Sequence, residues 1–224
     1  MLKPKKKITR KDIQRDPFLE SVAQTQAHLE ENRSLYMKAA IGLIIVLLGY
    51  NIMTEKNTQH KIDASTALGQ ALVALDRGDV TNAQFQLETV LNEFEGTSSS
   101  SVAGYYLGKM KYESGDATQA EQYLTVFFND KPVDILASSA ALMLSDIEAQ
   151  RNDMNGAVSY LDQGRKKSRD AHTYRMLELS KAHLYLKQGD LEGARIIVDG
   201  LLTEKDLSSD QKQVTEEIIG NIVG

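Results

Sequence analysis

The side chains best suited to chemistry are four histidines and a few adjacent acidic pairs, because imidazole and carboxylate groups bind metals and transfer protons. The histidines are His28, His60, His172 and His183. Their spacing matches no metal-binding motif, and pairs such as Glu216-Glu217 are typical of a solvated helix surface. The chain has no cysteine, no GxSxG motif and no phosphate-binding glycine loop. We therefore expect a protein that is not an enzyme and that holds no metal and no cofactor.

A two-residue turn motif recurs four times at a constant interval of 37 residues. The turns are Gly78-Asp79, Gly115-Asp116, Asn152-Asp153 and Gly189-Asp190. Glycine readily takes the positive φ that ends a helix, and asparagine is the other residue that tolerates it. The aspartate that follows can cap the next helix. A fixed interval of this length indicates stacked structural repeats.

Small side chains flank each turn at fixed distances. Seven residues before the Gly or Asn they are Ala71, Gly108, Ser145 and Ala182, and four residues after the Asp they are Ala83, Ala120, Ala157 and Ala194. Antiparallel helices approach closely only where both present small side chains, so we expect Ala120 to face Gly108. Each turn therefore predicts a helical hairpin.

The predicted elements are all helices. The hairpins cover residues 64–76 and 80–94, 103–114 and 117–129, 133–151 and 154–167, and 172–188 and 191–203. A last amphipathic helix over residues 209–223 presents apolar residues on one side and charges on the other. It is typical of the cap that the end of a solenoid needs.

This pattern resembles the tetratricopeptide repeat family, whose unit is a helix–turn–helix with small residues at these crossing points. Residues 101–132, including the closing Pro132, match best. The chain departs from the family in having no Trp, in its 37-residue period, and at Gln70 and Lys181, where Leu107 and Leu144 supply an apolar residue. We expect the extra residues to lengthen connections such as 96–100. The resemblance implies an all-α solenoid of about four repeats with a C-terminal capping helix.

The apolar run AAIGLIIVLLGYNIM, residues 39–53, is the second organising feature. A membrane span needs about 20 residues, and extending the run backwards supplies them. We predict a basic tail with an amphipathic helix at 1–34, starting its helix at Pro17, a transmembrane anchor at 35–54, a connector at 55–62 and the repeat domain at 63–224. The alternatives are a buried core helix and a cleavable signal peptide, which fits poorly because 38 residues precede the run.

Charge predicts the orientation of the anchor. Residues 1–56 carry 10 Lys/Arg and 6 Asp/Glu, a net charge of +4, whereas residues 57–224 carry 16 and 25, a net charge of −9. Nine of the basic residues precede Ala39, so the N-terminus is expected in the cytoplasm and the repeats in the periplasm or another extracytoplasmic space. The basic tail has no interleaved aromatic residues, so we expect lipid contact through the anchor and no nucleic-acid partner.

The first helices of stacked hairpins line a concave face in such repeats. Ten, six and three residues before each turn, the chain has Leu68, Leu72, Leu75, Tyr105, Lys109, Tyr112, Leu142, Asp146, Ala149, Leu179 (with Met176 as its alternative), His183 and Leu186. One interpretation is a partner-binding groove for extended or helical protein segments, with the two tyrosines as apolar, hydroxyl-bearing contacts. The other is that a tight superhelix buries these side chains between units.

The whole layout resembles the ancillary subunits of the bacterial SecYEG translocon: a basic tail, one anchor and an acidic repeat domain of about 160 residues. This resemblance implies an inner-membrane protein that relays newly exported proteins to chaperones. The implied partners are translocon subunits, a membrane-anchored prolyl isomerase and exported client chains. Two alternatives stay open. One is a structural scaffold that holds a fixed partner in an envelope assembly complex, and the other is a cytoplasmic-side regulator with the opposite topology.

Overall fold

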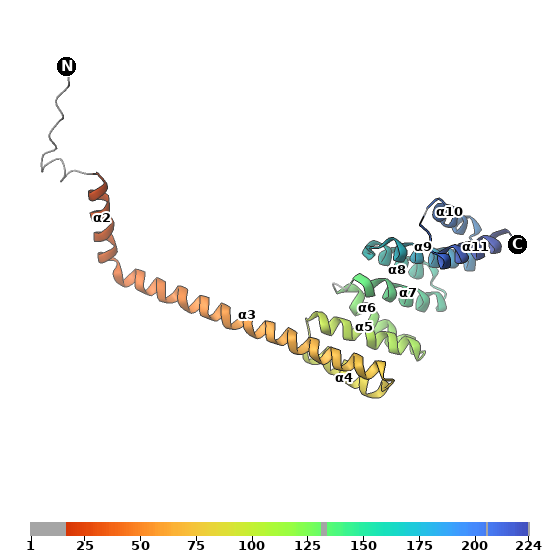
Figure 1. Ribbon diagram of the computed structural model, residues 1–224, viewed down its shortest axis with the longest axis horizontal. Coiled ribbons are helices and arrows are strands. Elements are labelled where there is room, and N and C mark those ends of the chain that lie inside the picture. The colour runs from red at the N-terminus through yellow and green to blue at the C-terminus, as the bar shows by residue number, and fades with distance from the viewer. Residues whose placement is uncertain (1–16, 131–133, 205, 224) are drawn as a thin grey trace, which may run out of the picture. The chain divides into compact units, whose positions relative to one another are not determined.

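The computed structural model describes residues 17–130, 134–204 and 206–223, and its regular structure over these residues is entirely helical. Pro132 and residues 1–16 of the basic tail lie outside them. Ten helices, α2 to α11, are described (Figure 1). The chain divides into two compact units, Met1–Thr58 and Gln59–Gly224. The predicted all-α fold class is confirmed for the described residues.

The first unit holds α2 (Pro17–Glu31) and the first part of α3 (Arg33–Asp76). Helix α2 begins at the predicted Pro17. Within α3 lies a stretch that is long and apolar enough to cross a membrane, judged by length and composition. Its large apolar side chains from Ile41 to Met53 are 53–74% exposed, so the burial expected of a core helix is missing.

Helix α3 continues without a break into the second unit. Residues 55–62, for which the sequence suggested a connector, are helical and form the middle of α3. The last turns of α3 form the first helix of the first hairpin. There Ala71 packs in one cluster with Leu87 and Val90 of α4 (Val80–Glu93).

Three further hairpins follow in chain order (Figure 1). They are α5 (Ser98–Glu113) with α6 (Ala117–Asn129), α7 (Asp134–Gln150) with α8 (Met154–Lys167), and α9 (Ala171–Gln188) with α10 (Leu191–Leu202). The chain ends in α11 (Ser209–Val223), which contacts both α9 and α10. This helix covers the last hairpin, because Ile218 is fully buried against the apolar cluster between α9 and α10.

Each turn joins two helices by one compact set of backbone bonds. At the second turn, the N–H of Gly115 donates to the carbonyl of Tyr112 (3.0 Å) and the N–H of Asp116 donates to that of Lys111 (2.9 Å). This is the Schellman pattern, which requires a left-handed residue. At the four turns the left-handed residues are Gly78, Gly115, Asn152 and Gly189, with φ between 63° and 82°.

The aspartate of each turn then starts the second helix. The carboxylate of Asp116 accepts a hydrogen bond from the N–H of Gln119 at 3.0 Å. Asp79, Asp153 and Asp190 accept in the same way from the N–H three residues further on. One residue therefore closes the first helix through its N–H and caps the second through its side chain.

The small residues beside the turns are all buried. They are Ala71, Ala83, Gly108, Ala120, Ser145, Ala157, Ala182 and Ala194. The partner of Gly108 differs from the expected one, since a methyl group on Gly108 would lie 2.7 Å from Cγ of Leu124. The closest approach therefore lies one turn beyond Ala120, and the predicted pairing of Ala120 with Gly108 is corrected to Leu124 with Gly108.

The connection before α5 is shorter than predicted. Residues 98–100, placed in a loop by the sequence analysis, form the first turn of α5. Thr97 caps this helix, because its hydroxyl oxygen accepts from the N–H of Ser100 at 3.1 Å. The first helices have 16, 17 and 18 residues in α5, α7 and α9, against 13, 14 and 12 in their partners. At the α4–α5 and α8–α9 connections, the additional length of the repeat thus lies in helices.

The polar substitutions at the packing position have two different explanations. Leu107 and Leu144 are fully buried. Lys181 is mostly covered, but its Nζ lies 2.8 Å from Asp162 Oδ1 and above the Tyr185 ring, so its charge has partners. Gln70 is exposed on the first hairpin. A polar side chain therefore costs little at this end of the stack.

Replacing Ala120 with Leu should destabilise the repeat domain by roughly 1–3 kcal/mol, because a buried helix contact has no room for a larger side chain. Urea unfolding followed by circular dichroism measures the change. Ala171→Leu, at an exposed position on α9, is the control and should leave stability nearly unchanged. Equal stability of Ala120→Leu and the wild-type chain would contradict the described packing of α5 on α6.

Candidate functional site

The first helices of successive hairpins lie next to one another, so that α5 contacts α7 and α7 contacts α9. The predicted groove residues therefore occupy neighbouring helices of one stack. The structure separates them into three kinds of position: buried between hairpins, hydrogen-bonded between hairpins, or open to solvent.

Tyr105 and Leu179 are buried rather than open, at 4% and 1% exposure. The Tyr105 ring packs 5.2 Å from the ring of Phe127, and its hydroxyl donates to Ser139 Oγ of α7 at 2.9 Å. Leu179 belongs to the cluster that includes Ala182. Placing these two residues on an accessible groove is therefore corrected, because the units approach closely enough to enclose them.

Tyr112 forms a second hydrogen bond between units. Its hydroxyl donates to Asp146 Oδ2 of α7 at 2.6 Å, and the amide of Gln150 donates to the same oxygen at 2.6 Å. Burial raises the pKa of Tyr112 to about 12, and the hydrogen bond and charge of Asp146 add to this shift. The two tyrosines that were predicted to contact a partner thus bond α5 to α7 within the chain.

A pocket of about 430 Å³ opens beside this bond, between α7 and α9. Leu142, Ser145 and Asp146 line it from α7, Leu161 from α8, and Ser180, His183, Leu184 and Lys187 from α9. We call it the α7–α9 pocket. It combines an apolar floor with a carboxylate on one side and His183 and Lys187 on the other. Such a surface can hold an apolar side chain while its polar rim bonds the neighbouring groups of a peptide.

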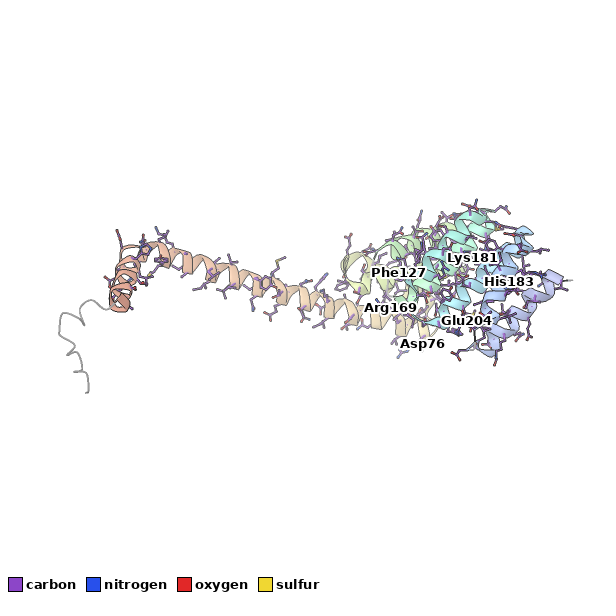
Figure 2. All side chains as sticks on the ribbon, turned by 90° about the horizontal axis from the view of Figure 1, so that it is seen from above. Asp76, Phe127, Arg169, Lys181, His183 and Glu204 are labelled. Atoms are coloured by element: carbon purple, nitrogen blue, oxygen red, sulfur yellow. The ribbon has the colours of Figure 1, made fainter. Side chains whose placement is uncertain are left out.

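Of the predicted groove residues, Leu142 and His183 line this pocket together with Asp146. His183 is exposed on α9, where Figure 2 labels it close to Lys181. Leu68, Leu72 and Met176 are half-buried, and Met176 packs against the cluster between α9 and α11. Lys109 is 44% exposed and lies 3.7 Å from Glu113 of its own helix.

Five pocket residues were not predicted as binding residues: the apolar Leu161 and Leu184, and three polar ones. Ser145 was assigned to helix packing; it is buried, but it also lines the pocket. Ser180 and Lys187 lie nine and two residues before their turn, outside the periods used to select the concave face. The usable signal was the spacing of Ser180, His183 and Lys187, three and four residues apart, which places these polar side chains on one side of α9.

A second hollow lies away from the first helices. It measures about 590 Å³ and is lined by residues of α4, α5, α6 and their connections, including Leu91, Tyr123, Val126 and Phe127. Phe127 itself is buried. Among the described residues, no group of three His, Cys, Asp or Glu side chains is arranged to hold a metal. The arrangement offers contacts for a partner, and non-catalytic function remains an expectation.

Replacing Tyr112 with Phe should remove the bond to Asp146 and cost roughly 1 kcal/mol of stability. The variant should also change the pH dependence. In the wild-type chain, the contribution of Tyr112 is fully present below pH 10, its ordinary pKa, and is lost as pH rises from 10 to about 12. The free energy of unfolding measured across this range should fall more steeply with pH for the wild-type chain than for Tyr112→Phe. Identical slopes would contradict the bond.

The comparisons with known proteins agree with this architecture. The model of the tetratricopeptide repeat-like domain family matches residues 26–214, which is most of the chain. No match was found among curated proteins or among solved structures. Repeats of this family typically serve as protein-interaction modules. The α7–α9 pocket offers a surface for such an interaction. The chain therefore belongs to the tetratricopeptide repeat-like domain family.

Proposed function

We propose that the protein is an inner-membrane protein-interaction module whose repeat domain lies in the periplasm or another extracytoplasmic space. Its work there is that of an ancillary translocon subunit, which receives newly exported chains and passes them to chaperones. Its partners are translocon subunits, a membrane-anchored prolyl isomerase and the exported chains themselves. The anchor is the predicted segment 35–54.

The exposed apolar stretch of α3 is the observation that carries this proposal. Ten large apolar side chains between Ile41 and Met53 are more than half exposed. At about 25 cal/mol per Å² of apolar surface, leaving such a stretch in water is strongly unfavourable. A bilayer removes this cost along the whole helix, and every backbone group of the helix is already hydrogen-bonded.

The charge distribution supports the proposed orientation. The basic excess precedes the apolar stretch, and the repeat domain carries the acidic excess. Basic residues remain on the cytoplasmic side during insertion, whereas an acidic domain can be carried across. The repeat domain then meets proteins as they leave the translocon. The α7–α9 pocket accepts an apolar side chain together with polar neighbours, which suits short segments of many sequences.

The scaffold alternative has one observation in its favour. The Tyr105–Ser139 and Tyr112–Asp146 hydrogen bonds fix α5 against α7. The two tyrosines are thus hydrogen-bonded within the chain and are not free to adapt to varied partners. A rigid binding face suits one fixed partner in an envelope assembly complex, whereas a relay of exported chains needs tolerance. The two functions differ in the number of partners.

The topology is testable because the chain has no native cysteine. Glu30→Cys and Ser209→Cys place single thiols at exposed positions before and after the anchor. A membrane-impermeant maleimide should label Ser209→Cys from outside the inner membrane and label Glu30→Cys only after the membrane is opened. The reverse pattern would indicate the cytoplasmic-side regulator. Release of the chain from membranes by alkaline washing would contradict the anchor.

The partners are testable by photocrosslinking in cells. A photoreactive amino acid at Leu142 or His183 faces the α7–α9 pocket, whereas one at Ile196, 65% exposed on α10, is the matched control. We expect translocon subunits and many exported proteins from the pocket positions only. One protein in fixed ratio would indicate the scaffold. Equal products from Ile196 would show that the pocket is not the binding surface.

A further inference from the structure

The first hairpin has an outer face that no described residue covers. It includes Thr66, Gly69, Gln70 and Val73 of α3 with Asn82 and Gln86 of α4, and we call it the open face. These residues line a depression of about 510 Å³. A side chain added at Gly69 would meet nothing within 4 Å, which shows how much room the face leaves.

The corresponding positions in later units are covered. Val73 recurs at the 37-residue interval as Met110, Ile147 and Leu184. Ile147 and Leu184 are 1% and 9% exposed, and Leu184 packs into a cluster formed mainly by the preceding hairpins. Val73 is 49% exposed. The open face is therefore a stacking surface to which a further helical element fits.

Side-chain spacing on α3 indicates a helix as the covering element. Ile62, Thr66, Gly69 and Val73 follow one another at intervals of four, three and four residues, the spacing of a two-helix seam. Ile62 is 51% exposed. The opposite side of α3 carries the buried Ala64 and Ala71, so the seam is not needed for packing within the hairpin.

The chemistry of the open face indicates which helix. Residues 57–224 carry a net charge of −9, so two copies repel each other over most of their surfaces. Of the nine residues that line the depression, Arg77 and Asp79 carry opposite charges and the others are uncharged. Glutamine and asparagine amides both donate and accept hydrogen bonds, so such a face is complementary to itself. The Gln86 amide donates to Asn82 Oδ1 at 3.0 Å, whereas its buried Oε1 has no hydrogen-bond partner among the described residues.

We propose that the open face pairs with the same face of a second copy of this chain, in a two-fold symmetric dimer with Val73 at its centre. In an isologous interface each residue near the axis meets its own counterpart. The seam of α3 lies against the seam of its partner, Gly69 permits close approach, and the amides around Val73 bond across the axis. This pairing does not depend on the identity of the partner bound at the α7–α9 pocket.

The first test is the mass of the full-length chain in detergent solution, measured by light scattering over a range of concentrations. We expect a monomer–dimer equilibrium. Val73→Glu places two carboxylates at the axis and should raise the dimer dissociation constant by at least about tenfold. Val126→Glu makes the same change at another exposed valine, 67% exposed on α6, and should leave it unchanged.

The second test uses single cysteines in bilayers. Val73→Cys should form a disulfide between two copies under mild oxidation, and Val126→Cys should form it much more slowly. The proposal fails if the wild-type chain is a monomer at all concentrations. It also fails if Val73→Glu dimerises as well as the wild-type chain, since another surface then holds the dimer. Circular dichroism melting of both glutamate variants shows whether each remains folded. Crosslinking of Val73→Cys to a different protein, instead of to a second copy, would also contradict the proposed dimer.

Discussion

The two-residue turn between helices is the constraint on which the rest of the repeat domain depends. The N–H groups of its Gly or Asn and Asp bond back to the helix that ends, and the Asp carboxylate caps the helix that begins. Because both functions share one residue, the angle and register between the helices are fixed. Each aspartate cap is worth about 0.5–2 kcal/mol. Inserting one residue would rotate the second helix and turn its buried alanine away from the partner helix.

Contacts between successive hairpins decide how much of the concave face remains accessible. Tyr105 and Tyr112 reach from α5 to α7, and Arg151 of the α7–α8 turn pairs with Glu121 of α6 at 2.6 Å. Lys181 and Arg165 join α8 to α9 through Asp162 and Glu178. Partly exposed pairs of this kind add about 0–1 kcal/mol each, so their main effect is on geometry. On the described concave face, they leave the α7–α9 pocket open.

The hairpins follow from the sequence because local rules decide them: positive φ at Gly115 and Asn152, and capping by the aspartate beside each. The start of α5 does not follow, since three serines suggest a loop until Thr97 is recognised as their cap. The accessible site follows only in part. Helical periodicity places Tyr105 and His183 on the same predicted concave face, yet one is buried and the other exposed. That difference depends on the distance between units, which no local pattern encodes.

The bond between Tyr112 and Asp146 also bears on how the domain unfolds. A linear array of hairpins behaves as a row of coupled segments, whose free energies combine with those of the junctions between neighbours. Every tie across a junction makes adjacent segments melt together instead of fraying singly. A partner in the α7–α9 pocket contacts two neighbouring hairpins at once and binds only when both are folded. Binding of the partner would therefore also stabilise hairpins that the partner does not contact.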